Sequence, residues 1–380
     1  MIDQTRNHIL VVEDDQVHRL LMGRYLQNEG HQVTFAVDGR QAIELLYAIS
    51  FDMILLDIEM PVVNGYQVLE HIISDPRLRE TPVIVTSALD QLESVVRCIE
   101  MGAEDYLTKP VNRVLLKARI DASLEKKRLR DIQTAALKRL EREMEIARLT
   151  QMSILPNALP QAESYDFGAL IIPARAVGGD FYDFLPMPNH TWGIVIGDVS
   201  DKGLPAALYM TLTYSLLRVE ASHGNTPAQA LLNVNQYLLG MNTSSMFVTV
   251  LCGILDPIDQ TFTYARAGHP APLLLNPDGE IQKIPSGPSQ AVGIFDPLTI
   301  DTAQIAIPQG STLLLFSDGV TEALNPDDQQ YDELRLPEIL KTCHHNTAQE
   351  ICQILWQDVQ SHSGPLPQQD DFTLVVVKHI

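Results

Sequence analysis

Five short apolar runs alternate with amphipathic segments across residues 8–120, and this alternation constrains the fold more than any other feature of the chain. The runs are predicted β-strands, at residues 8–12, 32–37, 53–56, 83–86 and 105–107. The segments between them, such as residues 17–28 and 40–49, have helical spacing. Strands that alternate with helices form a parallel sheet covered on both faces. We therefore expect an α/β domain here.

A stretch without proline or glycine follows at residues 121–150, and six positions between residues 137 and 154, all but one of them apolar, recur at alternating spacings of three and four. That spacing is typical of a helix with a short heptad-like stripe. Two interpretations remain open: a single helix that packs on its own domain, or a helix that forms a homodimer and carries a signal. Pro156 and Pro160 predict where the helix ends. The stripe consists of Leu137, Leu140, Met144, Ala147, Gln151 and Ile154.

Residues 166–380 are richer in predicted strands, with helical segments inserted in blocks. The predicted helices cover residues 205–221, 227–239 and 347–361, and the predicted strands cover residues 167–172, 192–198, 246–255, 261–265, 272–275, 311–316 and 372–378. Clustered strands with separate blocks of helices favour an α+β sandwich. We therefore divide the chain into an N-terminal domain (1–120), a helical linker that is a possible coiled coil (121–155) and a C-terminal domain (156–380).

The composition limits the classes of function. The formal net charge is -21, and such an acidic surface repels the phosphate backbone of DNA. The cysteines lack the spacing of a metal site, as is typical of a protein in a reducing compartment. We find no signal-peptide pattern and no apolar run near the roughly 18 residues that span a bilayer. We expect a cytoplasmic protein that acts neither on DNA nor in a membrane.

Polar side chains follow the ends of predicted strands in the N-terminal domain. Glu13 and Asp14 follow the first strand, Asp57 the third, Ser87 the fourth and Lys109 the fifth. In a parallel sheet, functional groups gather at the carboxyl ends of the strands. Three carboxylates there suit Mg²⁺, and Asp57 would be a nucleophile towards a phosphoryl group that Ser87 and Lys109 contact. Taken alone, an acidic pair after a strand is also typical of a helix N-cap.

Four segments of residues 8–120 resemble the receiver domain of two-component response regulators, namely ILVVEDD, DMILLDIEMPVVNGYQVL, PVIVTSA and GAEDYLTKP. The resemblance implies a flavodoxin-like (βα)5 fold and phosphorylation of Asp57 by a sensor histidine kinase or a phosphotransfer protein. The implied Mg²⁺ ligands are Glu13, Asp14, Asp57 and the carbonyl of Glu59. The residues implied to contact the phosphoryl group or to switch with it are Ser87, Lys109 and Tyr106.

A second set of aspartates flanks predicted strands in the C-terminal domain, and several of them stand beside glycine. The set consists of Asp180, Asp198, Asp318 and Asp370. Without cations these carboxylates would repel one another, so their convergence would suit a pair of hard divalent cations. Such cations lower the pKa of a shared water and orient it towards a phosphate ester. Taken alone, each Asp-Gly pair is also typical of a turn.

Segments of residues 145–378 resemble the PPM-type serine/threonine phosphatases, in the bacterial SpoIIE/RsbU-like branch related to eukaryotic protein phosphatase 2C. The segments are ARLTQMSILP, PARAVGGDFYDF, GDVSDKGLPAALYM, MFVTVLCGILDP, RAGHPAPLLL, FSDGVTEA and DDFTLVVVK. The resemblance implies an αββα sandwich with a binuclear Mn²⁺ or Mg²⁺ centre. The implied direct metal ligands are Asp198, the carbonyl of Val199, Asp318 and Asp370, with Asp180 a ligand directly or through water. The acids implied in catalysis are Asp198 and Asp318.

Other positions in these segments leave alternatives open. Arg175 is either a contact for the substrate phosphate or an exposed structural residue. Asp201 stands in GDVSDKG where glycine is expected, so this loop must form without glycine at that position. For His269 in AGHP, the residue pattern favours a structural role at a tight turn over an acid–base role. The sequence assigns no role to Asp183 or Asp371.

The order of the domains predicts a phosphorylation-controlled response regulator whose output is dephosphorylation of a phosphoserine or phosphothreonine protein. The family resemblance implies a phosphorylated STAS-domain anti-sigma-factor antagonist as the substrate. Phosphorylation would shift an equilibrium, for example between arrangements of a linker dimer, but the sequence does not encode activation or inhibition. The alternative is a catalytically silent adaptor that binds a sigma factor or another regulatory partner. That class predicts replaced aspartates, and none of the four is replaced.

Overall fold

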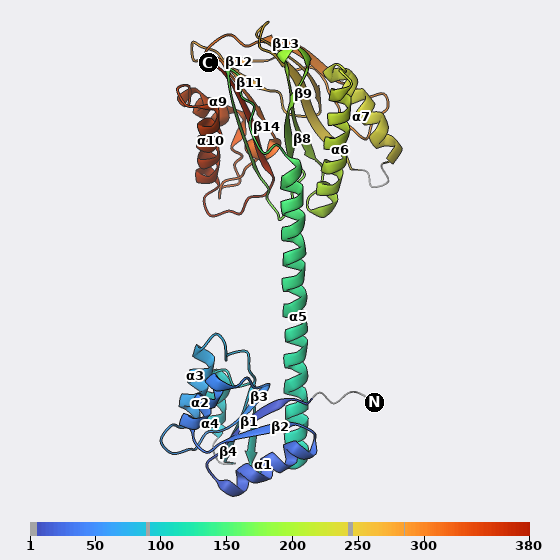
Figure 1. Ribbon diagram of the computed structural model, residues 1–380. Coiled ribbons are helices and arrows are strands. Elements are labelled where there is room, and N and C mark those ends of the chain that lie inside the picture. The colour runs from blue at the N-terminus through green and yellow to red at the C-terminus, as the bar shows by residue number, and fades with distance from the viewer. Residues whose placement is uncertain (1–5, 89–91, 242–245, 285) are drawn as a thin grey trace. The chain divides into compact units, whose positions relative to one another are not determined.

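The computed structural model describes residues 6–88, 92–241, 246–284 and 286–380 (Figure 1). They divide into two compact units, which meet in sequence between Leu140 and Glu141. Each unit has its own sheets and its own hydrophobic core, so each is described by itself. None of the helices in these ranges combines the length and the apolar composition needed to cross a membrane.

The N-terminal unit is built on a parallel sheet with the strand order β2-β1-β3-β4-β5. Its strands are β1 (His8–Val12), β2 (Gln32–Ala36), β3 (Met53–Asp57), β4 (Val83–Ala88) and β5 (Asp105–Lys109). Its first four helices are α1 (Gln16–Asn28), α2 (Gly39–Ala48), α3 (Gly65–Ser74) and α4 (Leu92–Glu100). Strand β3 is buried along its whole length, as expected where helices cover both faces of the sheet. This is the flavodoxin-like order, and it confirms the predicted fold class.

Helix α5 (Arg113–Ile154) is 42 residues long. It begins in the N-terminal unit, where Leu116 and Ile120 are buried in the hydrophobic core. It continues without interruption because residues 113–154 contain neither proline nor glycine. It ends before Pro156, as the sequence predicts. The expected start of a linker at residue 121 therefore lies inside one continuous helix.

The C-terminal unit contains two five-stranded antiparallel sheets, with the orders β13-β10-β9-β8-β7 and β12-β11-β14-β15-β6. The strands of the first sheet are β7 (Phe181–Pro186), β8 (Trp192–Val199), β9 (Val248–Asp256), β10 (Thr261–Ala267) and β13 (Asp301–Ala306). The strands of the second sheet are β6 (Tyr165–Ile172), β11 (Leu273–Leu275), β12 (Ile281–Lys283), β14 (Thr312–Phe316) and β15 (Phe372–His379). The helices are η1 (Pro188–His190), α6 (Leu204–Ser222), α7 (Pro227–Met241), α8 (Asp318–Thr321), α9 (Asp332–Thr342) and α10 (Ala348–Ser363).

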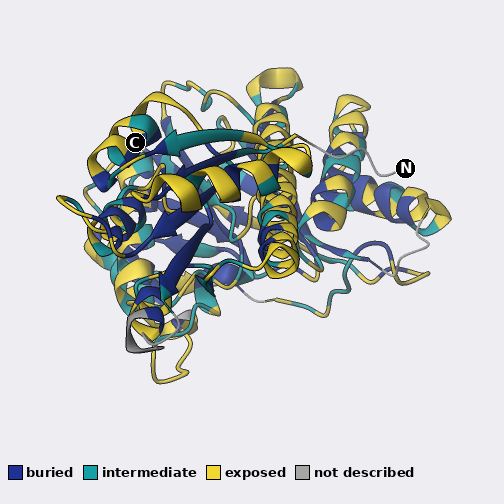
Figure 2. Ribbon diagram, turned by 90° about the horizontal axis from the view of Figure 1, so that it is seen from below, coloured by how far each residue is buried: buried dark blue, intermediate teal, exposed yellow. Residues whose placement is uncertain are grey.

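These elements form four layers. The two sheets pack face to face, with side chains such as Ile196 from the first and Val375 from the second in one core. Helices α6 and α7 cover the outer face of the first sheet, and α9 and α10 cover that of the second (Figure 1). The sheet strands are largely buried, while the helices keep exposed outer faces (Figure 2). This αββα sandwich confirms the predicted architecture of the C-terminal domain.

Candidate functional site

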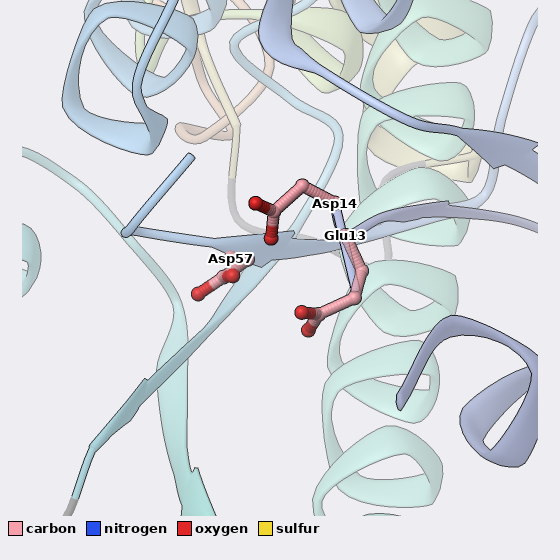
Figure 3. A group of neighbouring side chains, drawn as sticks. All are labelled: Glu13, Asp14 and Asp57. Atoms are coloured by element: carbon pink, nitrogen blue, oxygen red, sulfur yellow. The ribbon is translucent and has the colours of Figure 1, made fainter. Parts of the chain in front are cut away.

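Three acidic side chains meet at the carboxyl edge of the receiver-type sheet (Figure 3). Glu13 and Asp14 follow β1, and Asp57 ends β3, which pairs with β1 in parallel register. Each of the three offers a carboxylate oxygen, and these oxygens all lie within 4.8 Å of one another. Within the part of the chain that the structure describes, no other group of three or more acidic, histidine or cysteine side chains gathers so closely.

Local hydrogen bonds leave Glu13 and Asp14 available at this edge. The N-cap of α1 is Asp15, whose Oδ1 accepts a hydrogen bond from the backbone N–H of His18 at 2.8 Å. The guanidinium of Arg19 donates hydrogen bonds to the carbonyls of Glu13 and Asp14, at 2.7 and 3.0 Å. The capping role that the sequence allowed for the acidic pair therefore falls to the next residue.

Lys109 joins two of these acids. Its Nζ lies 2.8 Å from Oδ2 of Asp57 and 3.0 Å from the carboxylate of Glu13. Glu13 is fully buried, and burial, together with the charge of Asp57, raises its pKa to about 7. Burial lowers the pKa of Lys109, but hydrogen bonds to Asp57 and Glu13 outweigh it and leave that pKa raised. The arrangement balances one ammonium against several carboxylates, so a cation would relieve the remaining repulsion.

The other predicted receiver residues surround this group. Ser87 is buried near the end of β4, beside β5 in the sheet, and the Lys109–Pro110 peptide bond is cis. The backbone N–H of Glu59 donates to Oδ1 of Asp57 at 3.3 Å. Tyr106 is half-buried on β5, and the guanidinium carbon of Arg119 lies 6.0 Å from the centre of its ring.

The aspartates of the C-terminal unit stand at the ends of strands in both sheets. Asp180 directly precedes β7, and Asp198 lies near the end of β8, with Phe181 opposite Gly197 in the antiparallel register. Asp318 follows β14, and Asp370 precedes β15, with Phe316 opposite Leu374. Antiparallel pairing therefore brings acids from distant parts of the chain to neighbouring strand ends.

The electrostatics of these acids favour a cation. Burial, followed by the charges of Asp198 and Asp371, raises the pKa of Asp180 well above its usual value. Burial and the charge of Asp318 raise the pKa of Asp198 to about 7. Burial and the charge of Asp370 raise the pKa of Asp318. Carboxylates that raise each other's pKa in this way fit Mn²⁺ or Mg²⁺, although no three of their oxygens lie within 4.8 Å of one another.

Asp370 and Asp371 differ in what they contact. Asp371 is buried, and its carboxylate accepts hydrogen bonds from the backbone N–H groups of Ala174 at 2.8 Å and Gly179 at 2.6 Å. The side chain of Asp370 is 36% exposed, and its Oδ2 lies 2.9 Å from Nζ of Lys202. Asp371 therefore holds the loop before Asp180, whereas Asp370 is partly exposed and pairs with Lys202.

The loop that follows β8 has aspartate at the position where glycine is expected. Asp201 has φ 75°, in the left-handed region where aspartate is tolerated better than most residues. Its Oδ1 accepts a hydrogen bond from the N–H of Lys202 at 2.9 Å. Val199, whose carbonyl is an expected ligand, is buried at the start of this loop. A side chain at Gly179 would lie 2.9 Å from that carbonyl, so the two loops are in contact.

Two further predicted residues are placed very differently. Arg175 is exposed, and its Nη1 lies near Gly203, at the end of the loop after Asp198. His269 is buried and its Nδ1 lies 3.0 Å from Oγ1 of Thr249. Burial lowers the pKa of His269 to about 3, so the ring is neutral near pH 7. This environment supports the structural interpretation of His269.

Three site-forming residues were not singled out by their chemistry in the sequence. The side chain of Gln151 contacts the loop before Asp180. Lys202 pairs with Asp370, and Thr373 donates a hydrogen bond to Asp180. The spacing of apolar residues assigned Gln151 to the helical stripe, whereas its side chain is buried and hydrogen-bonded. Each of the three residues lies within a segment that resembles the phosphatase family, and that position was their signal in the sequence.

The fold and the two acidic sites define a response-regulator receiver domain followed by a PPM-type phosphatase domain. Residues 9–121 match the response regulator receiver domain, and residues 188–380 match the family of Stage II sporulation protein E (SpoIIE). The chain belongs to the SpoIIE family, in a form that carries an N-terminal receiver domain.

Individual relatives agree with this assignment. Protein IcfG of Synechocystis is 32% identical over 263 residues, which are 62% of this chain and 41% of that protein. The phosphoserine phosphatase RsbU of Bacillus subtilis is 30% identical over 246 residues, which are 63% of this chain and 70% of RsbU. The SiaA-PP2C domain of Pseudomonas aeruginosa shares the fold over 65% of this chain and 98% of its own, with a TM-score of 0.57 and 22% identity. The chain thus spans less than half of IcfG and most of RsbU.

Proposed function

We propose that the chain is a response regulator whose output is the metal-dependent dephosphorylation of a phosphoserine or phosphothreonine protein. The observation that carries this proposal is the set of strand-end acids in the sandwich, with raised pKa values at Asp180, Asp198 and Asp318. Burying several carboxylates together costs free energy unless a cation compensates their charge. The relationship to the phosphoserine phosphatase RsbU supports the same class of reaction.

In this function, the acids of the sandwich hold the metal centre. The ligands would be Asp180, Asp198, the carbonyl of Val199, Asp318 and Asp370. Bound Mn²⁺ or Mg²⁺ would supply an activated water for attack on the phosphate ester. Asp198 and Asp318 would orient that water, and the exposed guanidinium of Arg175 would bind the phosphate of the substrate.

The receiver site would control this output. Glu13, Asp14, Asp57 and the Glu59 carbonyl would hold Mg²⁺, and Asp57 would accept the phosphoryl group from a sensor histidine kinase or a phosphotransfer protein. Lys109 already pairs with the Asp57 carboxylate and would pair with the phosphoryl group. Ser87 would donate a hydrogen bond to the phosphoryl group, and Tyr106 would be the aromatic switch residue.

Residues 121–155 would serve as the linker between the two domains. In the stripe of this helix, Leu137 and Leu140 are 54% and 53% exposed, whereas Gln151 is buried in the C-terminal unit. We propose that the exposed part forms a homodimer contact and that the buried part belongs to the phosphatase domain. The substrate would be a phosphorylated STAS-domain protein, and the setting the cytoplasm.

The direct test is hydrolysis of p-nitrophenyl phosphate by the full chain at increasing Mn²⁺ concentration. We expect turnover that depends on Mn²⁺. Asp198→Asn and Asp318→Asn should each reduce it by more than the roughly 10–100-fold loss that is typical when a residue supporting a metal ligand is changed. Equal, metal-independent rates for the wild type and both variants would contradict the proposal that the chain is a metal-dependent phosphatase. They would favour the catalytically silent adaptor.

Control by the receiver is tested with the same assay. We expect beryllofluoride or acetyl phosphate to change the rate of hydrolysis by the wild type and to leave the rate of the Asp57→Asn variant unchanged. Equal rates with and without these phosphoryl donors or mimics in the wild type would contradict the coupling, while leaving the phosphatase proposal intact.

A further inference from the structure

The last turn of helix α5 holds a buried backbone segment of the phosphatase domain through one side chain. Nε2 of Gln151 donates a hydrogen bond to the carbonyl of Gly178 at 2.7 Å. The N–H of Gly178 donates to Oε1 of Gln151 at 3.1 Å. The carboxamide thus pairs with both backbone groups of Gly178, as a residue of a neighbouring strand would. Gln151 and Gly178 are both buried, so water cannot readily take the place of these two hydrogen bonds.

The segment from Gly178 to Asp180 is held on a second side by Asp371. Oδ2 of Asp371 accepts hydrogen bonds from the N–H groups of Gly179 at 2.6 Å and Asp180 at 3.3 Å. A Cβ atom at Gly178 would lie 2.5 Å from the same oxygen, so only glycine fits there. The segment is therefore positioned by a carboxamide from helix α5 and by a carboxylate at the start of β15.

Asp180 follows this segment directly and has little freedom of its own. Its Oδ2 accepts a hydrogen bond from Oγ1 of Thr373 at 2.5 Å. The adjoining helix end is fixed as well, because Leu155 is buried in the core that contains Phe181 and Val199, and Met152 packs against that core. The last turn of α5 is therefore fixed on the core, and it places Gln151 against the segment that leads into Asp180.

We propose that Gln151 is a positioning residue for Asp180, so that helix α5 acts on the acid cluster of the phosphatase through the Gln151–Gly178 pair. Loss of the pair would leave two buried backbone groups without partners and would let the Gly178–Asp180 segment move. This inference rests on the proposed metal-dependent phosphatase function. It assigns to the linker helix a contact with the site, not only the role of a spacer.

The test uses the full chain carrying Gln151→Met, which keeps the length of the side chain and removes both hydrogen bonds. The Asp14→Asn background removes one proposed ligand of the receiver site, so that Mn²⁺ binding by calorimetry reports on the phosphatase acids. We expect the dissociation constant for Mn²⁺ to rise by roughly 10–100-fold, the range of outer-shell partners of metal ligands. Backbone hydrogen exchange across residues 174–182 should become faster in the metal-free protein.

Two matched controls separate positioning from general stability. Gln133→Met makes the same change at an exposed position of the same helix and should alter neither measurement. Met152→Ala removes apolar packing beside Gln151 but keeps both hydrogen bonds, so it should lower the melting temperature and weaken Mn²⁺ binding much less than Gln151→Met does. The proposal is overturned if Gln151→Met leaves Mn²⁺ affinity and hydrogen exchange unchanged, or weakens affinity no more than Met152→Ala. If the parent protein binds no Mn²⁺ while Gln151→Met still accelerates exchange, the contact stands and the metal-dependent function fails.

Discussion

Thr373 donates a hydrogen bond from Oγ1 to Oδ2 of Asp180 at 2.5 Å, whereas Oδ1 of Asp180 has no hydrogen-bond partner among the described residues. Asp180 is 2% exposed, so water does not solvate the second oxygen. The carboxylate is held in one orientation and is disfavoured in its charged form. A buried acid in that state is suited to binding a divalent cation, and without one it lowers the stability of the protein.

We therefore predict that Asp180→Asn stabilises the metal-free phosphatase domain by about 1–2 kcal/mol, because it removes a buried charge from the cluster. The same change should abolish the stabilisation that Mn²⁺ confers on the wild type. Thermal unfolding in EDTA and in Mn²⁺ measures both effects. Lower stability of the variant in EDTA, with an undiminished Mn²⁺ effect, would contradict a cation-binding role.

The pH dependence of stability follows from the raised pKa values of Asp198 and Glu13, both about 7. In the unfolded chain these groups lose their protons near pH 4, so between roughly pH 4 and 7 the folded state binds more protons. Their contribution to the free energy of unfolding must fall as the pH rises through this window, by at most about 4 kcal/mol for each group, and then level off. Urea unfolding in EDTA at several pH values, with Asp198→Asn as the control, measures the effect. An identical pH profile for that variant would show that Asp198 does not contribute.

Lys109 is predicted to stabilise the receiver domain far more than an exposed lysine does. Its Nζ pairs with Asp57 and Glu13, whose side chains are 3% and 0% exposed. Lys109→Met should cost about 3 kcal/mol, because it leaves two buried carboxylates without their cation. Lys117→Met removes an exposed pair with Glu29 and should cost less than about 1 kcal/mol. Denaturant unfolding measures both, and Mg²⁺ should restore part of the loss in Lys109→Met only. Equal losses in the two variants would contradict this account.

Asp201 is predicted to be a site where glycine stabilises the chain. Its φ of 75° costs a non-glycine residue roughly 1 kcal/mol, and its hydrogen bond goes to an exposed N–H of Lys202, for which water can substitute. Asp201→Gly should therefore raise the melting temperature of the phosphatase domain. Asp259→Gly, at an exposed turn position without a positive φ, should lower it instead. A decrease for both variants would mean that the Asp201 hydrogen bond outweighs the strain.

The receiver strands could be predicted from the sequence because each is a continuous apolar run. The run at residues 53–56 becomes β3, one residue longer. Strand β7 was missed because FYDFLP contains an aspartate, and Asp183 is buried beside Arg218 of α6, at 3.3 Å. Strand β13 was missed because its sequence, DTAQIA, is polar at the edge of its sheet. Edge strands and ion pairs of buried acids depend on partners that are distant in the sequence.

The candidate site shows the same limit. Motifs predicted which acids would lie at strand ends, because their positions follow apolar runs. They did not predict that Asp371 binds backbone N–H groups while Asp370 pairs with Lys202, since the two aspartates are neighbours in one motif. Nor did they predict the partner of Gln151, which lies 27 residues away at Gly178. Such pairings arise only when both segments have folded.

The most direct test of the central claim is the stoichiometry of Mn²⁺ binding to the full chain. Calorimetry should be carried out on the wild type, on Asp14→Asn, which impairs the receiver site, and on Asp198→Asn, which impairs the phosphatase site. We predict that Asp14→Asn retains the binding that supports hydrolysis of p-nitrophenyl phosphate, and that Asp198→Asn loses both that binding and the hydrolysis. If wild type and Asp198→Asn bind Mn²⁺ identically, the strand-end acids do not form a metal centre and the account fails.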